Sequence, residues 1–510
     1  MQFYPKARQQ RLSINHPTVR PLRLAVLKAA GINLLLLQLL FLGLFCYIFG
    51  SLFQQSTRIN HINVLFVDYD GGAIGSAVRS AYENLKGSGF PTLIERSTDA
   101  YPHPGSTVDA ICDIKYWAAL YTSSNASERL VSALAGGSAA SSYNTSNVLT
   151  MVWNEARYST VVDSAISQSL TELAEAARVA YMETGGKQLI QSLNTSDSSA
   201  ISIFSDPWTL SSIDLQPTTQ GSRLIYNTLV IILILIQEFF FLGTINGLYQ
   251  QFQLYTAVSP HRIVIVRQIM SGIYTFIGSL CTAGAIWAFR HGWEVNGNQF
   301  VLTWMVLWLF AHLNFLTLDV FTIWLPPPYV PMALISWVVL NVTSILLPFE
   351  LSPGFYQVGY ALPAHSVFQV LIDIWSGGCN PQLNYALPVM FAVEIISLVL
   401  SSVGVYRRAH YAIIKKELDE KSCQDRVEAA INERLDRLPE MEEADQADLE
   451  SEISGSGLER SSTLQRRATV ATLEDQEEIA NIIRRELSRP ERTITSRENT
   501  GPSFSLPFNI

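Results

Sequence analysis

Charge is scarce in this sequence: Asp, Glu, Lys and Arg together make up 15% of its 510 residues, whereas 48% of the residues are hydrophobic. This balance excludes an ordinary soluble protein of this size, because soluble domains carry roughly a quarter of their residues as charges. The net charge of −9 says little about partners, because basic and acidic residues lie in different parts of the chain. We expect an integral membrane protein with no nucleic-acid partner.

The sequence also lacks the common signatures of metal sites and enzymes. Its five cysteines, Cys46, Cys112, Cys281, Cys379 and Cys423, show no C-x-x-C spacing and have no neighbouring histidines. This excludes a zinc site or a disulfide-rich scaffold. The patterns G-x-S-x-G, H-E-x-x-H and the phosphate-binding G-x-x-x-x-G-K-[ST] are absent as well. We therefore predict no metal, no cofactor, no catalytic residue and no enzymatic activity.

Long apolar runs are abundant. Crossing the hydrocarbon of a bilayer takes about 20 residues of helix. Windows of that length predict six spans: residues 29–53, 226–248, 265–289, 300–324, 330–349 and 387–406. The first has the position of a signal peptide, but its apolar core is longer than a signal's and no small-residue cleavage site follows it. We interpret it as a retained anchor.

Basic residues predict the orientation. The segment 1–28 contains Lys6, Arg8, Arg11, Arg20, Arg23 and Lys28 and no acid, and the last span is followed by Arg407, Arg408, Lys415 and Lys416. By the positive-inside rule both termini are cytoplasmic. Six crossings also require both termini on one side, so the two arguments agree. The insert 54–222 and the loop 350–386, which has no Lys or Arg, then lie outside the cytoplasm.

The sequence pattern of the insert predicts an α/β or α+β domain. Runs such as residues 62–70 have the apolar, β-branched content of a buried strand, and they alternate with helical patterns such as residues 72–85. Asp68 and Asp70 follow a strand where turn and capping residues belong, so we interpret the domain as a binding or packing module.

The outer side also carries candidate modification sites. Three glycosylation sequons lie there, at Asn125, Asn144 and Asn194. Cys112 and Cys379 are its only two cysteines, so a disulfide between them and two free buried thiols both fit the sequence, and free thiols are the commoner case.

Four segments carry a resemblance: "VLFVDYDGGAIGSAVRSAYENL", "YWAALYTSSNASERLVSAL", "VWNEARYSTVVDSAISQSL" and "YALPAHSVFQVLIDIWSGGCNPQLNYALPV". With the predicted layout, they resemble the fungal nitrosoguanidine-resistance membrane proteins and their domain of unknown function. These are similar to the membrane subunits of type-two ABC exporters that have a large extracytoplasmic domain. The likeness covers most of residues 25–415.

The resemblance implies a protein of the plasma membrane, or of endomembranes, that contributes to tolerance of toxic compounds by export or lipid translocation. Its partners would be membrane lipids, amphiphilic small molecules and a separate ATPase or a second copy, because the chain has no nucleotide-binding motif of its own. The alternative is a non-transporting regulator or scaffold that affects lipid organisation.

Ionisable residues inside the predicted spans are the candidate functional site. Glu238 stands beside Gln237 at the middle of the second span, where an unpaired charge costs several kcal/mol. His312 lies at the centre of the fourth span, so we hypothesise that it meets Glu238 and shares a proton with it. Asn314 and Asp319 extend the polar residues along that span. The alternative is that these groups only hold helices together by hydrogen bonds.

Two further predictions concern the regions outside the spans. Residues 364–375 form an amphipathic pattern too short to cross, which predicts an interfacial helix that touches lipid or caps the bundle. The tail 407–510 becomes highly charged and predicts disorder, with helical patterns at residues 423–435 and 473–487. Within it "RRAT" makes Thr469 a candidate phosphorylation site.

Overall fold

The computed structural model describes residues 16–17, 20–218, 229–290, 295–452, 477, 480–481 and 484. The chain divides into two compact units. The first comprises Met1–Leu242, Gln268–Phe321 and Pro328–Leu400, and the second comprises Gly243–Arg267, Thr322–Pro327 and Ser401–Ile510.

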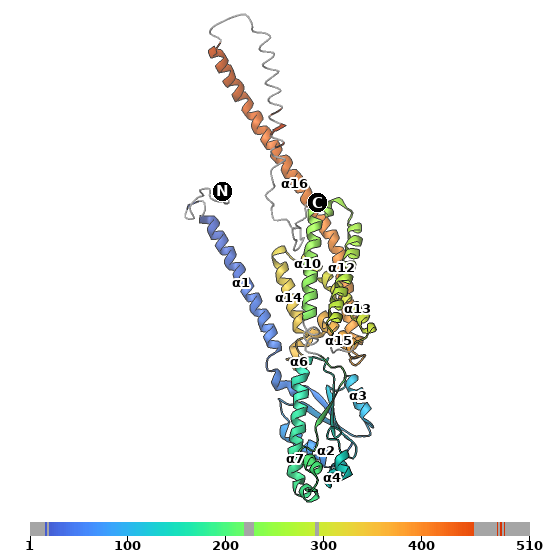
Figure 1. Ribbon diagram of the computed structural model, residues 1–510. Coiled ribbons are helices and arrows are strands. Elements are labelled where there is room, and N and C mark those ends of the chain that lie inside the picture. The colour runs from blue at the N-terminus through green and yellow to red at the C-terminus, as the bar shows by residue number, and fades with distance from the viewer. Residues whose placement is uncertain are drawn as a thin grey trace, which may run out of the picture. The chain divides into compact units, whose positions relative to one another are not determined.

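A five-stranded sheet forms the core of the insert (Figure 1). Its strands are β1 (Asn63–Asp68), β2 (Thr92–Arg96), β3 (Ala118–Thr122), β4 (Leu149–Trp153) and β5 (Leu210–Asp214), in the order β2-β1-β3-β4-β5. Strand β1 runs parallel to β2 and β3, β4 runs antiparallel to β3, and β5 runs parallel to β4. The mixed sheet confirms the predicted α/β character of this region.

Helices cover both faces of the sheet, because successive side chains of a strand point to opposite faces. Val64 and Phe66 of β1 pack into the larger hydrophobic cluster, and Leu65 and Val67 pack into a smaller one. The helices of the first face are α2 (Ala73–Leu85), α4 (Ala126–Leu134) and α7 (Gln168–Ser192), and α3 (Pro104–Cys112) covers the second. The shorter elements of the insert are η2 (Gln55–His61), α5 (Ser138–Ser142), α6 (Ser159–Val162), η3 (Asp163–Ser167) and α8 (Ser198–Ser205).

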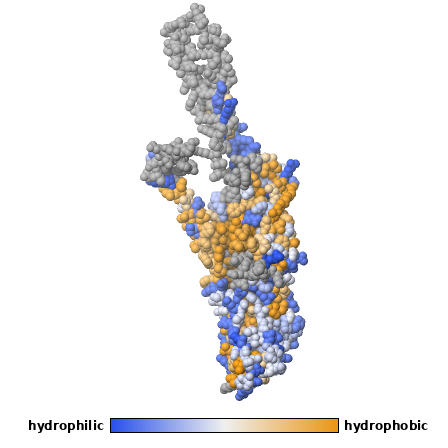
Figure 2. Space-filling view, in the orientation of Figure 1, coloured by the Kyte–Doolittle hydropathy of each residue, from blue (hydrophilic) through white to orange (hydrophobic). Residues whose placement is uncertain are grey.

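Among the described residues, five helices are long and apolar enough to span a membrane. They are α1 (Arg20–Ser51), α10 (Val230–Gln251), α12 (Pro260–Ala288), α13 (Gly297–Trp324) and the first part of α16 (Leu383–Glu452). From Ala29 onward helix α1 carries no charged residue, and its Leu34 and Leu35 are 65% and 60% exposed, which suits a lipid environment. Figure 2 shows the hydrophobic surface over these helices and a mixed surface over the sheet region. The chain is thus a helical membrane protein with an α/β region after its first span.

The fifth predicted span differs from the expectation. Helix α14 (Val330–Thr343) has 14 residues, about 21 Å of helix against about 30 Å of hydrocarbon. The side chains of Asn341, Thr343 and Ser344 hydrogen-bond to backbone carbonyls of the same helix. Such bonds compete with helix propagation, and the chain turns before Pro348. Asn341 Oδ1 also accepts a hydrogen bond from Ala364 N at 3.1 Å.

Helix α15 (Pro363–Trp375) replaces the predicted interfacial helix and is buried on both faces. Its polar residues Ser366, Gln369 and Asp373, which the amphipathic pattern places opposite the apolar side, are 0%, 5% and 8% exposed. The insert covers this helix: the rings of Tyr158 and Phe368 lie 4.9 Å apart. Burial raises the pKa of Asp373, while the backbone N–H of Asn380 donates to its carboxylate and offsets part of that rise.

The charged tail also departs from the composition-based prediction of disorder, because α16 continues as one helix to Glu452. Residues of good helix propensity fill this stretch, and Lys416 and Glu420 form an i, i+4 ion pair at 3.8 Å. The island at 423–435 lies within this helix. Thr469 and most of the 473–487 island lie outside the described residues. The remaining elements are α11 (Leu254–Ala257), η5 (Pro327–Tyr329) and η6 (Gly354–Ala361).

Candidate functional site in the membrane helices

His312 joins three helices of the first unit. It lies near the middle of α13, and its Nδ1 is 2.6 Å from Oε1 of Glu394 in α16. Its Nε2 is 3.2 Å from Oγ of Ser271 in α12. When the Glu394 carboxylate is ionised, Nδ1 must carry a proton, because a carboxylate accepts only. The result is a carboxylate, imidazole and hydroxyl series across the bundle.

This arrangement corrects the hypothesis that His312 meets Glu238. Both imidazole nitrogens are occupied, by Glu394 and Ser271. Glu238 is 1% exposed, and its Oε2 has no hydrogen-bond partner among the described residues. Oε2 of Glu394 is likewise buried without such a partner. Two buried carboxyl oxygens in the bundle are therefore open to a proton or a cation.

Gln237 is placed by a glycine of the neighbouring helix. A Cβ built on Gly278 of α12 would lie 2.2 Å from Nε2 of Gln237, so the Gln237 side chain can keep this position only while residue 278 is glycine. Gly278 and Ser271 are seven residues apart in α12, or about 10 Å of helical rise. Gln237 is thus about two helical turns away from His312 along the bundle.

The other predicted polar residues are buried on α13. Asn314 accepts a hydrogen bond from Nε1 of Trp337 at 2.9 Å and donates to the carbonyl of Phe310 at 2.7 Å, which suits a structural role. Asp319 is fully buried. Between them, the hydroxyl groups of Thr317 and Ser397 lie 3.0 Å apart, one turn beyond the His312 and Glu394 pair.

Sequence reasoning missed Glu394, although the signal was present. Glu394 is the acid inside the predicted span 387–406, surrounded by apolar residues. An acid at that depth is a functional hypothesis by the argument that selected Glu238. Ser271 and Gly278 carried no such signal, because small residues are ordinary in membrane helices.

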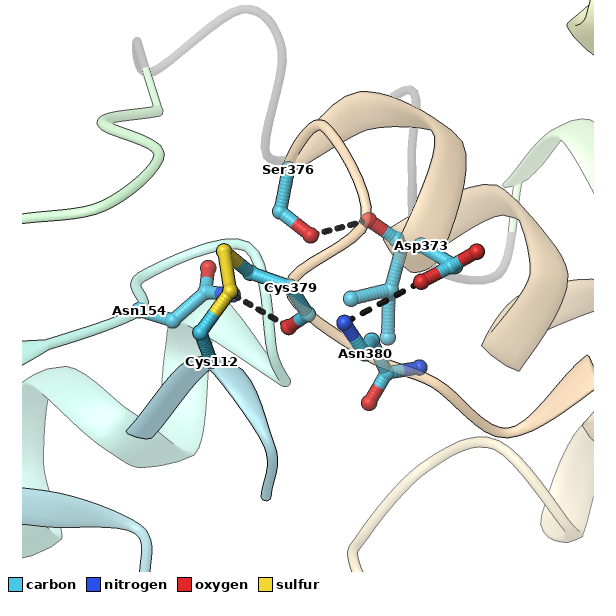
Figure 3. Close-up of a disulfide and its surroundings, with 7 residues drawn as sticks. Cys112, Asn154, Asp373, Ser376, Cys379 and Asn380 are labelled. Atoms are coloured by element: carbon cyan, nitrogen blue, oxygen red, sulfur yellow. Dashed lines mark hydrogen bonds between the residues drawn. A yellow bond between two sulfur atoms is a disulfide. The ribbon is translucent and has the colours of Figure 1, made fainter. Parts of the chain in front are cut away.

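A disulfide joins the sheet region to the loop before the last span (Figure 3). It links Cys112, at the end of α3, to Cys379, which follows α15. Asn154 Nδ2 donates to the carbonyl of Cys379 at 3.2 Å, and Asn380 N donates to Asp373 at 3.1 Å. Gly377 and Gly378 have φ of 65° and 98°, a left-handed conformation that ends α15 and turns the chain toward the bridge.

The remaining candidates of the insert lie at its surface or serve local structure. Asn125, Asn144 and Asn194 are all exposed, and Oδ1 of Asn144 accepts a hydrogen bond from Ser146 N at 3.0 Å. Asp68 accepts from Gly71 N at 3.0 Å and pairs with Arg79 at 2.7 Å, which fits the turn role expected of it. No group of residues suited to a metal ion occurs within the part of the chain that the structure describes.

Comparison with known proteins places the chain in a family. The profile described as "Protein of unknown function (DUF3533)" matches residues 33–399. The chain belongs to the DUF3533 family. It is also similar to the uncharacterized endoplasmic reticulum membrane protein YJR015W of Saccharomyces cerevisiae, at 25% identity over 316 residues.

That alignment covers 59% of this DUF3533 chain and 60% of the relative, so the chain spans less than two thirds of the relative's length. No solved structure matches this DUF3533 chain. Its profile match runs from α1 into the spanning part of α16 and so includes Glu238, His312 and Glu394. The comparisons therefore establish that this chain is a membrane protein with an uncharacterised domain.

Proposed function

We propose that this DUF3533 protein is a membrane transport subunit that moves amphiphilic compounds or lipids and contributes to tolerance of toxic compounds. The observation that carries the proposal is the contact of His312 with Glu394 and Ser271 inside the helix bundle. Proton relays of membrane transporters are built from acidic and imidazole side chains that meet inside the bundle, as His312 and Glu394 do here. A hydrogen bond that only holds two helices together would require neither an acidic nor a basic side chain at this depth.

The polar side chains described above follow one another along the bundle, and we call them the polar series. Glu238 and Gln237 lie toward one end of the series, His312 and Glu394 follow about two turns on, and Thr317 with Ser397 lies one turn further. Protonation of Glu394 weakens its hold on the imidazole and so weakens the tie between α13 and α16. We propose that this tie closes the bundle and that its release opens a path for substrate.

The proposed topology has both termini in the cytoplasm and the sheet region on the opposite side. It requires α14 and the residues after it to complete a sixth crossing. The resemblance to exporter subunits suggests a second copy or a separate ATPase as partner, and we propose no catalytic activity for the chain itself. The plasma membrane and the endoplasmic reticulum are both consistent hosts, and the similarity to a yeast endoplasmic reticulum membrane protein supports the latter.

Reconstitution tests the proposal. The full chain in liposomes, with a pH difference across the bilayer, should move a fluorescent phospholipid or a lipophilic cation. Glu394→Gln and His312→Gln should each lower the initial rate at least tenfold, and Glu238→Gln should lower it as well. Glu172→Gln, a change of the same chemistry on the exposed surface of α7, is the matched control and should leave the rate unchanged.

Gly278→Ala separates a transport role from general packing. The added methyl must displace the end of Gln237, a flexible side chain, so the fold should survive while the polar series changes. Gly284→Ala on the same helix meets no atom within 4 Å and serves as its control. Full transport by Glu394→Gln and His312→Gln would contradict the proposal and leave these residues a structural role.

A second candidate function rests on α16. This helix continues from the membrane to Glu452, and a long charged helix is a common platform for protein partners. A non-transporting regulator should lose its cellular effect when the chain is cut after Ala430 and should keep it when Glu394 becomes Gln. A transporter should show the reverse pattern.

A further inference from the structure

The second unit contains a polar pocket that the polar series of the first unit does not use. Its volume is about 470 Å³. The end of α10, the short helix α11 and one face of α16 line it. Its charged lining residues are Lys415, Lys416, Asp419 and Glu420. A pocket that presents both signs of charge differs from the purely apolar surface expected against lipid tails.

The charges are ordered along α16. Two ammonium groups are followed, one helical turn later, by two carboxylates, a spacing of about 6 Å. The Lys416 and Glu420 pair stands at 3.8 Å, a length at which a ligand can separate the two groups at small cost, since exposed pairs contribute about 1 kcal/mol or less. Gln250 at the end of α10, Gln253 in the turn and Thr256 in α11 also line the pocket, and the two glutamine side chains are uncharged donors.

Buried aromatic and basic residues hold the opposite wall in place. The rings of Tyr249 and Tyr255 lie 5.4 Å apart and are 4% and 5% exposed. Arg267 lies with its guanidinium 5.5 Å from the Tyr249 ring centre, and Arg408 contacts the Tyr255 hydroxyl at 3.4 Å. Gln253 has a left-handed φ of 47°, which turns the chain from α10 into α11, and it lines the pocket at this turn.

Apolar side chains stand next to this polar lining. Phe252, Val258, Ile413 and Leu418 are 56%, 36%, 45% and 61% exposed. Two of them adjoin lining residues on the α10 side and two lie on α16. A molecule with a charged end and an apolar end would satisfy both surfaces at once.

We infer that this pocket binds the headgroup of an aminophospholipid, with the phosphate held by Lys415 and Lys416 and the ammonium group by Asp419 and Glu420. The phosphate and the ammonium of such a headgroup are separated by a two-carbon linker, which matches charges one helical turn apart. A headgroup with phosphate alone would leave the two carboxylates against its negative charge. This pocket shares no residue with the polar series that we propose for transport. Its test depends neither on transport activity nor on the orientation of the protein in the membrane.

Native mass spectrometry of the full chain in detergent tests the inference with short-chain lipids. Dihexanoyl phosphatidylethanolamine and dihexanoyl phosphatidylserine should bind. Dihexanoyl phosphatidylcholine should bind about tenfold more weakly, because its trimethylated nitrogen donates no hydrogen bond to a carboxylate. Inorganic phosphate, added as a competitor in excess, should displace neither lipid.

Two double variants separate the roles. Lys415→Gln with Lys416→Gln should lower the affinity for all three lipids about tenfold, since each loses its phosphate contacts. Asp419→Asn with Glu420→Gln should remove the preference over phosphatidylcholine, and it should weaken phosphatidylcholine less than the two aminophospholipids, because the trimethylated nitrogen loses only its charge attraction and no hydrogen bond. Glu417→Gln and Lys421→Gln, exposed on the same helix outside the pocket, are the controls and should change nothing.

Three outcomes would overturn the inference. If the unmodified chain bound phosphatidylcholine as tightly as the aminophospholipids, the proposed contact between the ammonium group and the two carboxylates would be wrong. Displacement of the lipids by inorganic phosphate would identify a free-phosphate site instead. Unchanged affinities in both double variants, with the chain eluting as the unmodified protein does, would show that the lipids bind elsewhere.

Discussion

Asp214 and Glu155 bring two carboxyl groups together where the sheet region ends. The Asp214 carboxylate accepts hydrogen bonds from Glu155 N at 3.0 Å and Gln216 N at 3.2 Å, and Glu155 accepts one from Thr218 N at 2.7 Å. Burial raises the pKa of Asp214 to about 7, and the adjacent Glu155 carboxyl contributes to the rise. These bonds fix the residues that follow β5.

We predict that the free energy of unfolding of the protein falls as the pH rises from the pKa of Asp214 in the unfolded chain to its pKa in the folded chain. The folded chain holds a proton on Asp214 up to about pH 7, whereas an unfolded aspartate loses it near pH 4. Within that window the folded state binds more protons, so each step upward in pH favours unfolding. Thermal unfolding of the full chain in detergent, followed from pH 4 to 8, should show a decreasing melting temperature.

Asp214→Asn should remove this part of the pH dependence, because asparagine does not titrate and still accepts the two backbone hydrogen bonds. Asp99→Asn, at an exposed position of the same region, is the control and should keep the slope of the unmodified chain. An unchanged slope in Asp214→Asn would assign the pH dependence to other groups.

At the scale of elements, the Cys112 to Cys379 bridge ties α3 to the segment between α15 and α16 across 267 residues of chain. Closing so long a loop restricts the unfolded chain and stabilises the folded one by about 2–4 kcal/mol. Cys112→Ser with Cys379→Ser should therefore lower the melting temperature of the full chain by several degrees. Reducing agent should lower the melting temperature of the unmodified chain and leave that of the double variant unchanged.

The pairing itself has a direct readout. Alkylation of the unreduced protein, followed by peptide mapping, should label Cys46, Cys281 and Cys423 and leave Cys112 and Cys379 linked. Cys46→Ser, at an exposed position in α1, should not change the melting temperature. Labelling of Cys112 before reduction would contradict the bridge.

Elements with a strong local pattern were predictable. Strand β1 and helix α2 fall within residues 62–70 and 72–85, because burial on both faces of a strand and on one face of a helix leaves its mark on consecutive residues. The short β5 was not predicted, since "LSSID" has little hydrophobic content and is placed only by pairing with β4. Helix α14 ends early because of Asn341, Thr343 and Ser344, whose hydrogen bonds are invisible to a hydropathy window.

The candidate site shows the same limit. Glu238 and His312 could be selected from their depth in apolar runs, but the partner of His312 could not, because Glu394 is 82 residues further along the chain. Helix periodicity fixes which residues share a face and not which faces meet. For the same reason the amphipathic pattern of α15 predicted a helix at the membrane interface, although the insert covers this helix.

At the scale of the whole molecule, the topology depends on α14. If α14 and the residues after it complete a crossing, six crossings put both termini on one side. If they turn back, the five long helices put the termini on opposite sides. Two observations favour a crossing: Asn341 at the end of α14 bonds to Ala364 N, and Ser344 O contacts His365 at 3.1 Å, so this end meets α15, which packs against the insert.

We predict that reporters fused to the two termini of the full chain will both report the cytoplasm, and that endoglycosidase treatment will increase the electrophoretic mobility of the protein. The increase should shrink stepwise as Asn125, Asn144 and Asn194 are replaced by Gln. Asn341→Gln, which removes the sequon Asn341-Val-Thr, should not change the glycosylation pattern, because Asn341 is fully buried in α14 and its side chain is hydrogen-bonded. Termini that report from opposite sides would show that α14 turns back within the membrane, and both α16 beyond the membrane and its pocket would then face away from the compartment that contains the amino terminus.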